Sequence, residues 1–490
     1  MLKLKDPSLF IQQALIGGAW TGAAGGATLT VDDPASGAVI GTVPDCSAED
    51  TERAIAAAAA AFRTWRLTTA AERARLLERW HDLLIENADD LALIMTLEQG
   101  KPLAEARGEI LYGATFIKWF AEEARRSYGM SIPAPTTDRR ILVSKEPVGV
   151  AAVITPWNFP NAMITRKCAP ALAAGCTVVI KPSELTPYSA LALGLLAERA
   201  GIPAGVINIV TGLPKIIGAT LTASPDVRKI SFTGSTAVGS LLMAQCAPTV
   251  KRLSLELGGN APFIVFDDAD LDAAVEAAIV SKFRNGGQTC VCANRLLVQA
   301  GIYDAFAEKL AARVRAMRVG PGVDDGTQIG PMINAAAVRK INTHLDDAMA
   351  LGARNITPRD DLPTGERYVA PAVLTGATTA MRLASEETFG PVAPLFRFES
   401  EAEAIEIANG TPYGLAAYFF TENLHRAWRI GEALEFGMVG LNTGSVSMEV
   451  APFGGVKQSG LGREGGPTGM EEYLEVKAFH VGGLKRSRSD

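Results

Sequence analysis

A regular alternation of two kinds of segment between residues 148 and 266 constrains the fold more than any other feature. Short apolar runs rich in β-branched residues, such as VGVAAVIT (148–155) and VRKISFT (227–233), are typical of strands that are buried on both faces. Segments of helical length, such as NAMITRKCAPALAA (161–174), lie between them. Strands that alternate with helices in this way predict a parallel, doubly wound α/β sheet.

A second α/β block follows the first. The segment DDADLDAAVEAAIVSKFRN (267–285) predicts a helix, for which Asp268 and Asp270 are candidate N-caps and Asn285-Gly286-Gly287 is a stop signal. Further strand and helix candidates continue to about residue 445. A chain of 490 residues is too long for one ordinary core. We therefore expect two large α/β units, formed by residues 1–138 with 150–260 and by residues 261–445.

Two further strand-like segments, RRILVSKEP (139–147) and EEYLEVKAFHVG (471–482), lie outside both units. Exposed strands offer unpaired backbone groups to another chain. We therefore expect residues 139–149 and 471–490 to form a small β oligomerisation arm of a homodimer or homotetramer.

The composition argues against several classes of protein. A formal net charge of −6 gives no reason to expect nucleic-acid binding. The most apolar stretch, AIAAAAAAF (54–62), is far shorter than the ~18–20 residues that span a bilayer, and the start of the chain lacks the apolar core of a secretory signal. Six cysteines in so long a chain do not form a disulfide framework. We expect a cytoplasmic protein that binds neither nucleic acid nor membrane.

The stretch GGQTCVCAN (286–294) places Cys290 and Cys292 one residue apart in a polar, glycine-rich setting. Two cysteines supply only half of a zinc site, and none of the four histidines lies near them in the sequence, so no metal is expected. Backbone N–H groups of a glycine-rich loop lower a thiol pKa and bind a developing oxyanion. Local chemistry thus leaves two interpretations of Cys290: a nucleophile, or a small residue packed in a core.

Two other motifs carry polar groups in unusual places. In LELGGN (255–260), Glu256 lies between leucines at the end of a predicted strand, where burial would raise its pKa and suit it to general-base catalysis. In PWNFP (156–160), two prolines stiffen a loop and hold the Asn158 amide as an oxyanion donor. The alternatives are a glutamate that caps the following backbone and an asparagine that satisfies its own turn.

Together with EETFGP (386–391) and PFGGVKQSG (452–460), these three motifs resemble the aldehyde dehydrogenase superfamily over almost the whole chain. The resemblance implies two Rossmann-like α/β domains, a nucleotide-binding one (1–138 and 150–260) and a catalytic one (261–445). It also implies that Cys290 attacks an aldehyde, that Asn158 and the Cys290 N–H bind the oxyanion, and that Glu256 activates water to hydrolyse the thioester. A base at Glu256 favours hydrolysis over acyl transfer to coenzyme A.

The Rossmann fingerprint G-x-G-x-x-G is absent from the expected strand–helix junctions. FTGSTAVG (232–239) instead places Gly234 and Gly239 around a predicted helix start, and a helix N-terminus suits a pyrophosphate. The resemblance adds Glu387 at the nicotinamide ribose and Phe389 near the ring. The full set of predicted cofactor-binding residues is Thr155, Pro156, Trp157, Asn158, Lys181, Pro182, Ser183, Glu184, Gly234, Ser235, Gly239, Leu257, Glu387 and Phe389.

The stretch KPSE (181–184) bears on the choice between NAD and NADP. The Glu184 carboxylate would accept hydrogen bonds from the adenosine ribose and repel a 2′-phosphate, which favours NAD. Lys181 would tolerate the phosphate, and similar proteins with a small residue at the Glu184 position use NADP. NAD is therefore the expected cofactor and NADP the alternative.

Three residues suggest a substrate with its own negative charge. Arg166 follows PWNFP, Arg284 precedes Cys290 by six residues, and Ser447 lies before the last motif. These positions match the carboxylate-binding residues of succinate-semialdehyde dehydrogenases, and an arginine pair can clamp a carboxylate. We expect succinate semialdehyde as the substrate. The alternatives are glutarate semialdehyde, which is one methylene longer, and a broad range of aldehydes with the arginines serving structure.

Cys292 has two interpretations. It is a small residue that lines the site, or it forms a reversible disulfide with Cys290 that switches activity off, as in some similar semialdehyde dehydrogenases. Only one residue separates the two cysteines, so such a ring would be strained and easily reduced.

Overall fold

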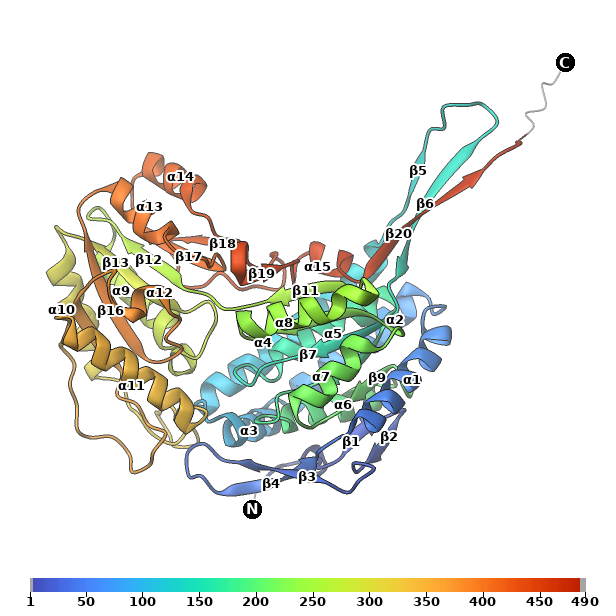
Figure 1. Cartoon of the computed structure of the whole chain (residues 1–490), viewed down its shortest axis with the longest axis horizontal. Helices are drawn as coiled ribbons and strands as arrows, with labels where there is room; N and C mark the ends of the chain where they lie inside the picture. Colours follow the sequence, from blue (N-terminus) through green and yellow to red (C-terminus); the bar gives the residue numbers. More distant parts are fainter. Residues whose placement is uncertain (1–2, 485–490) are drawn as a thin grey trace.

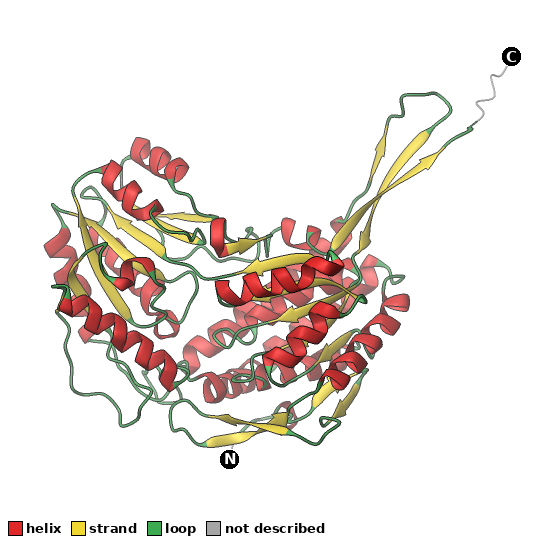
Figure 2. Cartoon of the chain, in the orientation of Figure 1, coloured by secondary structure: helices red, strands yellow, loops and turns green. Residues whose placement is uncertain are grey.

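The computed structural model describes residues 3–484, so residues 1–2 and the part of the predicted arm at 485–490 lie outside the described residues. Figure 1 shows two α/β bodies side by side and a β ribbon that projects from the larger one. Figure 2 shows helices and strands alternating in both bodies.

The larger body is built on an eight-stranded sheet whose five central strands are parallel and whose outer strands are antiparallel to their neighbours. The order is β19 (Gly460–Leu461), β11 (Arg252–Glu256), β10 (Val227–Thr233), β7 (Val150–Ile154), β8 (Thr177–Lys181), β9 (Ile207–Ile209), β1 (Ala14–Ile16) and β2 (Ala19–Thr21).

Alternate residues of β7 face opposite sides of this sheet, and each side has its own hydrophobic core. Ala151 and Val153 belong to one core, and Val150 and Ala152 belong to the other. The continuous apolar run at 148–155 predicts a strand of this kind, and the predicted doubly wound sheet is confirmed. One core contains α2 (Ala70–Glu86), α3 (Ala88–Gln99), α4 (Leu103–Glu123), α5 (Ala162–Ala174) and α6 (Tyr188–Ala200), and the other contains α1 (Ala48–Trp65), α7 (Pro214–Ala223) and α8 (Thr236–Cys246).

The smaller body has a seven-stranded sheet, parallel except for its first edge strand. Its order is β14 (Arg354–Asn355), β15 (Ala372–Ala377), β16 (Val392–Phe398), β13 (Ala293–Gln299), β12 (Ala261–Val265), β17 (Ala416–Phe420) and β18 (Met438–Leu441). One side packs on α9 (Leu271–Phe283) and α10 (Tyr303–Arg315), and the other on α11 (Ala335–Ala350), α12 (Arg382–Ser385), α13 (Glu401–Asn409) and α14 (Leu424–Ala433).

Helix α9 has one of the two predicted caps. The Asp270 carboxylate accepts the Ala273 N–H at 3.0 Å and caps the helix. Asp268 is not an N-cap, contrary to the prediction, because its carboxylate instead pairs with Arg426 Nη1 at 2.7 Å. The predicted stop is confirmed: Asn285-Gly286-Gly287 adopts left-handed φ angles of 52°, 61° and 76°.

The predicted strands outside the two bodies pair with each other. β6 (Arg140–Pro147) lies between β5 (Met130–Ile132) and β20 (Leu474–Val481) in an antiparallel sheet, the projecting ribbon of Figure 1. Val476 and Phe479 of β20 are 68% and 58% exposed, so the ribbon presents apolar side chains to its surroundings. The remaining elements are the hairpin β3 (Thr28–Asp32) and β4 (Val39–Pro44) and the short helix α15 (Thr468–Glu471).

Candidate active site

The predicted motifs meet at one edge of the larger sheet. β7, β10 and β11 are adjacent and parallel, and PWNFP, Gly234 and LELGGN stand at their carboxyl ends. Ligand sites of open α/β sheets lie outside this edge. Cys290 reaches the site from the smaller body, on the loop between α9 and β13.

Cys290 is half-buried and shares a small pocket with Arg166 and Arg284. Burial raises the pKa of its thiol to about 12, against the opposing effect of the Arg166 guanidinium. The backbone N–H of Cys290 does lower this pKa, as expected, but burial outweighs it and the net shift is upward. A thiol in this setting needs a base to become a nucleophile.

Glu256 is buried at the end of β11, as predicted. It is 2% exposed, and neither carboxylate oxygen has a hydrogen-bond partner in the described chain. The alternative, a glutamate that caps the following backbone, is therefore not observed. Burial and then the neighbouring Glu464 raise the pKa of Glu256 well above its ordinary value, against the opposing effects of Lys167 and Arg166.

Glu464, which is not among the predicted site residues, sets the charge around Glu256. It pairs with Lys167 Nζ and lies 2.6 Å from Arg166 Nε, although the second contact lacks hydrogen-bond alignment. Burial opposes ionisation, but Lys167 and Arg166 outweigh it and hold the pKa of Glu464 below its ordinary value. Of these two carboxyl groups, Glu464 is therefore the more readily ionised and Glu256 the more readily protonated.

Asn158 is held between the two bodies. Its Nδ2 donates to the Gln288 carbonyl at 3.0 Å, and its Oδ1 has no partner among the described residues. Its backbone carbonyl accepts from Lys101 Nζ at 2.7 Å and from Asn285 Nδ2 at 3.0 Å. The side chain thus reaches the Cys290 loop and does not satisfy its own turn.

Helix α4 supports both active-site loops. Lys101, just before the helix, pairs with Glu109 Oε2 at 2.5 Å, and Glu109 Oε1 accepts two N–H groups at the start of α5. Glu105, one turn earlier, accepts the Asn285 N–H at 2.8 Å. These buried contacts connect the Asn158 loop to the Cys290 loop. No local sequence motif marks Lys101, Glu105 or Glu109.

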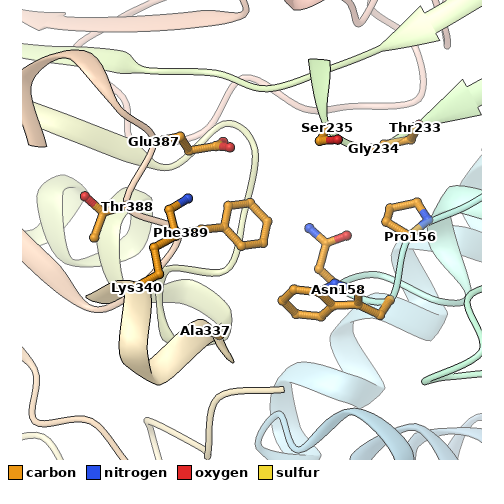
Figure 3. Close-up of a pocket in the computed structure, with 11 residues that line it drawn as sticks. Pro156, Asn158, Thr233, Gly234, Ser235, Ala337, Lys340, Glu387, Thr388 and Phe389 are labelled. Atoms are coloured by element: carbon orange, nitrogen blue, oxygen red, sulfur yellow. The ribbon is translucent and has the colours of Figure 1, made fainter. Parts of the chain in front are cut away.

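A second cavity, of about 280 Å³, is lined in part by Asn158, and Arg284 is not among its lining residues. Figure 3 shows Glu387 and Phe389 on one wall, with Asn158 and Pro156 opposite. Phe389 has a φ of 55°, a left-handed conformation that is uncommon for an aromatic residue. Strained backbone of this kind is concentrated at functional sites. Its ring packs edge-on against Trp157, with the ring centroids 5.6 Å apart.

Polar groups around this cavity fit a bound dinucleotide. The hydroxyls of Thr155 and Thr233 are buried and have no hydrogen-bond partner in the described chain. Helix α8 begins beside the cavity with Ser235 as its N-cap, and a helix N-terminus suits a phosphate. Glu387 is half-buried in the cavity wall, and desolvation raises the pKa of its carboxyl to about 7. Lys340 of α11 lines the same cavity, although no sequence motif points to it.

The other predicted cofactor residues lie at the same edge of the sheet but outside this cavity. Lys181 ends β8, Pro182 and Ser183 follow, and Lys181 Nζ pairs with Glu184 Oε2 at 2.7 Å. Leu257 occupies the space that a side chain at Gly239 would need. The contacts of these residues with a cofactor stay predictions.

The three predicted substrate-binding residues come together beside Cys290. Arg166, Arg284 and Ser447 line one pocket with aromatic side chains, and its free volume is about 20 Å³. The Arg284 guanidinium lies 5.0 Å from the Phe159 ring centroid and has no ion-pair partner among residues 3–484. Arg166 differs because it is 2% exposed and paired with Glu464.

Cys292 is 6% exposed, and its Sγ lies 3.3 Å from Lys282 Nζ. Burial raises the pKa of its thiol, with Lys282 acting in the opposite direction. All six cysteines are free in this structure, and Cys292 is a small packed residue in this state. The reversible disulfide stays a prediction; it requires that dithiothreitol restores peroxide-treated protein but not a Cys292→Ala variant.

Residues 3–484 lack two other kinds of feature. No cluster of three or more histidine, cysteine or acidic side chains there is arranged to hold a metal ion. No helix in the same range is both long and apolar enough to cross a membrane.

Comparison with known proteins gives one consistent result. The aldehyde dehydrogenase family model matches residues 20–479. A 3-sulfolactaldehyde dehydrogenase of Pseudomonas putida is 59% identical over 486 residues, covering 99% of this chain and 100% of the relative. Succinate-semialdehyde dehydrogenase [NADP(+)] of Escherichia coli is 57% identical over 481 residues, covering 98% and 100%. The crystal structure of an aldehyde dehydrogenase from Brucella melitensis biovar abortus 2308 is 63% identical, covers 99% and 100%, and superposes with a TM-score of 0.97. The chain therefore belongs to the aldehyde dehydrogenase family.

Proposed function

We propose that this protein oxidises a short aldehyde with a terminal carboxylate, succinate semialdehyde in first place, to the corresponding acid. The observation that carries the proposal is the Arg284 guanidinium, which lies in the pocket of Cys290 without a carboxylate partner in the described chain. A cation in such a place favours an anionic ligand. The names of the two relatives support the proposal, because 3-sulfolactaldehyde and succinate semialdehyde both carry a terminal anion.

Glutarate semialdehyde is the second candidate. Among the described residues, the contacts of the Arg284 guanidinium are with the rings of Tyr112 and Phe159, which leaves this long side chain free to meet a carboxylate one methylene further away. A single methylene changes the free energy of binding by only ~1–3 kcal/mol.

The side chains of the site supply a complete reaction. The Cys290 thiolate attacks the carbonyl carbon, and the Asn158 amide with the Cys290 N–H stabilises the oxyanion. The cavity beside Asn158 would hold a nicotinamide cofactor, which would supply the hydride acceptor for that carbon. The oxidised carbon stays on the sulfur as a thioester. Glu256 then takes a proton from water, which attacks the thioester and releases the acid and the Cys290 thiol.

The two shifted pKa values give Glu256 its role. The pKa of the Cys290 thiol is raised to about 12, so the thiol requires a base before it can attack. The raised pKa of Glu256 makes its carboxylate a stronger base than an ordinary glutamate. We propose that Glu256 takes the proton of the thiol, releases it to solvent once the thioester has formed, and then takes a proton from the attacking water.

We propose NAD as the preferred cofactor and NADP as the alternative. The Glu184 carboxylate can accept hydrogen bonds from the ribose hydroxyls, and its pairing with Lys181 at 2.7 Å neutralises the cation that would attract a 2′-phosphate. The Escherichia coli relative, named for NADP, supports the alternative.

We further propose that residues 1–138 and 150–260 bind the nucleotide, that residues 261–445 are catalytic, and that residues 139–149 and 471–490 form an oligomerisation arm. The exposed apolar side chains of β20 support a homodimer or homotetramer built through that ribbon. The six free cysteines support a reducing location such as the cytoplasm.

A spectrophotometric matrix tests the substrate and the cofactor together. Purified protein is assayed with succinate semialdehyde, glutarate semialdehyde and butanal, each with NAD and with NADP. We expect kcat/KM for succinate semialdehyde to exceed that for butanal by ~100-fold or more, the value of a charge-assisted contact to a carboxylate. Equal values for the two would contradict the proposal.

A single variant tests whether Arg284 causes the preference for succinate semialdehyde over butanal. Arg284→Leu should remove most of the advantage of succinate semialdehyde over butanal, because it deletes the unpaired cation. Arg75→Leu, on the exposed face of α2, is the matched control and should keep the wild-type ratio. If Arg284→Leu keeps the wild-type preference for succinate semialdehyde, a residue other than Arg284 binds the carboxylate.

A further inference from the structure

Tyr112 of α4 connects two of the substrate-pocket residues. Its hydroxyl is hydrogen-bonded to Ser447 Oγ and accepts from Arg166 Nη1 at 3.4 Å. The tyrosine lies one helical turn beyond Glu109, on the face of α4 that supports the active-site loops. Its ring packs edge-on against Phe116, with ring centroids 5.1 Å apart, which fixes the position of the hydroxyl.

The chemistry of these groups sets the direction of the hydrogen bonds. A guanidinium is only a donor, so the Tyr112 oxygen accepts from Arg166. Donation from a cation polarises the phenol and strengthens its own O–H as a donor. Either hydroxyl can donate in the Tyr112–Ser447 hydrogen bond; the polarised phenol is the stronger donor, which favours the Tyr112 hydrogen going to Ser447 Oγ and leaves the hydrogen of Ser447 for another acceptor.

Arg166 has little freedom to bind a substrate directly. Its Nε faces Glu464 at 2.6 Å, and its Nη2 contacts Met163 Sδ at 3.0 Å. The guanidinium also stacks on the Phe453 ring, 4.0 Å from the centroid. Both terminal nitrogens and the Nε thus have protein neighbours, in contrast to Arg284.

We infer that Tyr112 is a positioning residue for the substrate anion. Arg166 donates to Tyr112, Tyr112 donates to Ser447, and Ser447 donates to the terminal carboxylate, while Arg284 supplies the direct charge. This inference rests on the proposed function, since it explains how the same pocket recognises the anion. It assigns Arg166 an indirect part in recognition, through a chain of hydrogen bonds, in place of the direct clamp expected from the sequence.

The chain of donors makes the pocket selective. Ser447 is half-buried, and without an anion its hydrogen has no acceptor among the described residues, so an aldehyde that shields it from water leaves a donor unpaired and disfavours the complex. An aldehyde such as butanal therefore meets a pocket whose donors it cannot satisfy. Removal of the Tyr112 hydroxyl deletes the hydrogen bond that orients the Ser447 hydroxyl. The preference for an anionic aldehyde over butanal should therefore weaken.

The test is a double-mutant cycle on the ratio of kcat/KM for succinate semialdehyde to that for butanal. Tyr112→Phe keeps the ring and deletes only the hydroxyl, and we expect the ratio to fall ~10-fold, as for one hydrogen bond to a charged group. Ser447→Ala should lower the ratio at least as much. The double variant should be no worse than Ser447→Ala alone, because Tyr112 acts through Ser447. Tyr128→Phe, which deletes a hydroxyl from a 70% exposed tyrosine, is the matched control.

Each other outcome contradicts the inference. Additive losses in the double variant would mean that Tyr112 contacts the substrate itself. An unchanged ratio in Tyr112→Phe, including one that accompanies an equal loss for both aldehydes, would mean that the hydroxyl is only structural. A wild-type protein without any preference for the anionic aldehyde would instead overturn the proposed function, and the inference with it.

Discussion

The two sides of Cys290 differ in how their polar groups are satisfied. On the cofactor side there is a cavity of about 280 Å³, and the hydroxyls of Thr155 and Thr233 have no partner in the described chain. On the aldehyde side the free volume is about 20 Å³, and the Tyr112 hydroxyl is bonded to Ser447 and Arg166. The cofactor side thus has more free space and unpaired hydroxyls, whereas the Tyr112, Ser447 and Arg166 side chains of the aldehyde side are hydrogen-bonded to one another.

This difference predicts that the two sides control different properties: the cofactor side controls the affinity for the cofactor, and the aldehyde side controls the preference among aldehydes. The cofactor side offers free donors and acceptors, so its residues set the affinity for the cofactor whatever aldehyde is present. On the aldehyde side, a substrate has to replace contacts that the side chains make among themselves. Arg284 has no ion-pair partner in the described chain, so it can move to meet a substrate without breaking an ion pair. Changes on this side should alter the ratio between aldehydes.

The largest effect is expected where the two sides meet. Cys290→Ala removes the nucleophile, so kcat should fall at least ~10³-fold for every aldehyde and with either cofactor. Cofactor binding, measured by quenching of protein fluorescence, should persist because the cavity beside Asn158 is unchanged. Cys292→Ala is the control and should keep most of the activity. Rapid turnover by Cys290→Ala would exclude the covalent route.

Glu256→Gln should lower steady-state kcat by ~10²–10⁴-fold. Because Glu256 acts on the thiol as well as on the water, the first turnover of NADH formation, followed by stopped-flow absorbance, should also be slower than in the wild type. A base acts only when ionised, and the pKa of Glu256 is raised, so the wild-type rate should increase with pH through a range above that of an ordinary glutamate. The variant should lack this increase. A pH profile that is identical in both proteins would assign the base elsewhere.

Lys101→Met should lower kcat by ~10–100-fold for all aldehydes alike, because Lys101 holds the backbone of Asn158, the oxyanion donor. The ratio between succinate semialdehyde and butanal should stay at the wild-type value, which separates this effect from one on the aldehyde side. Lys118→Met, on the exposed side of α4, is the matched control. Thermal unfolding is measured in parallel, and a loss of kcat explained wholly by unfolded protein would contradict a positioning role.

The smallest effect is expected at the far end of the cofactor side. Glu184→Ser removes the carboxylate that pairs with Lys181, so the preference for NAD over NADP should shift ~10-fold toward NADP, the value of about one charged hydrogen bond. The aldehyde preference should not move. A change in aldehyde preference would show that the two sides of Cys290 are coupled.

Predictions from the sequence succeeded for features whose physical cause lies within one short segment. The apolar run at 148–155 predicts a strand buried on both faces, and Asn285-Gly286-Gly287 predicts the end of α9, because backbone preferences act within a few residues. The burial of Glu256 was also predictable, since leucines flank it at a strand end. Asp268 was predicted wrongly because its partner, Arg426, lies in a distant helix.

By itself, the sequence determined the alternation of strands and helices, the family, and the motifs that hold Cys290, Glu256 and Asn158. Only the tertiary structure decided which partner each polar side chain has. Arg166 faces Glu464, Tyr112 meets Ser447, and Lys101 reaches the Asn158 carbonyl, in each case across elements that are far apart in the chain. The reason is physical: periodicity and backbone preference act locally, whereas the partner of a buried charge is chosen by the packing of whole helices and sheets, which leaves it few groups within reach.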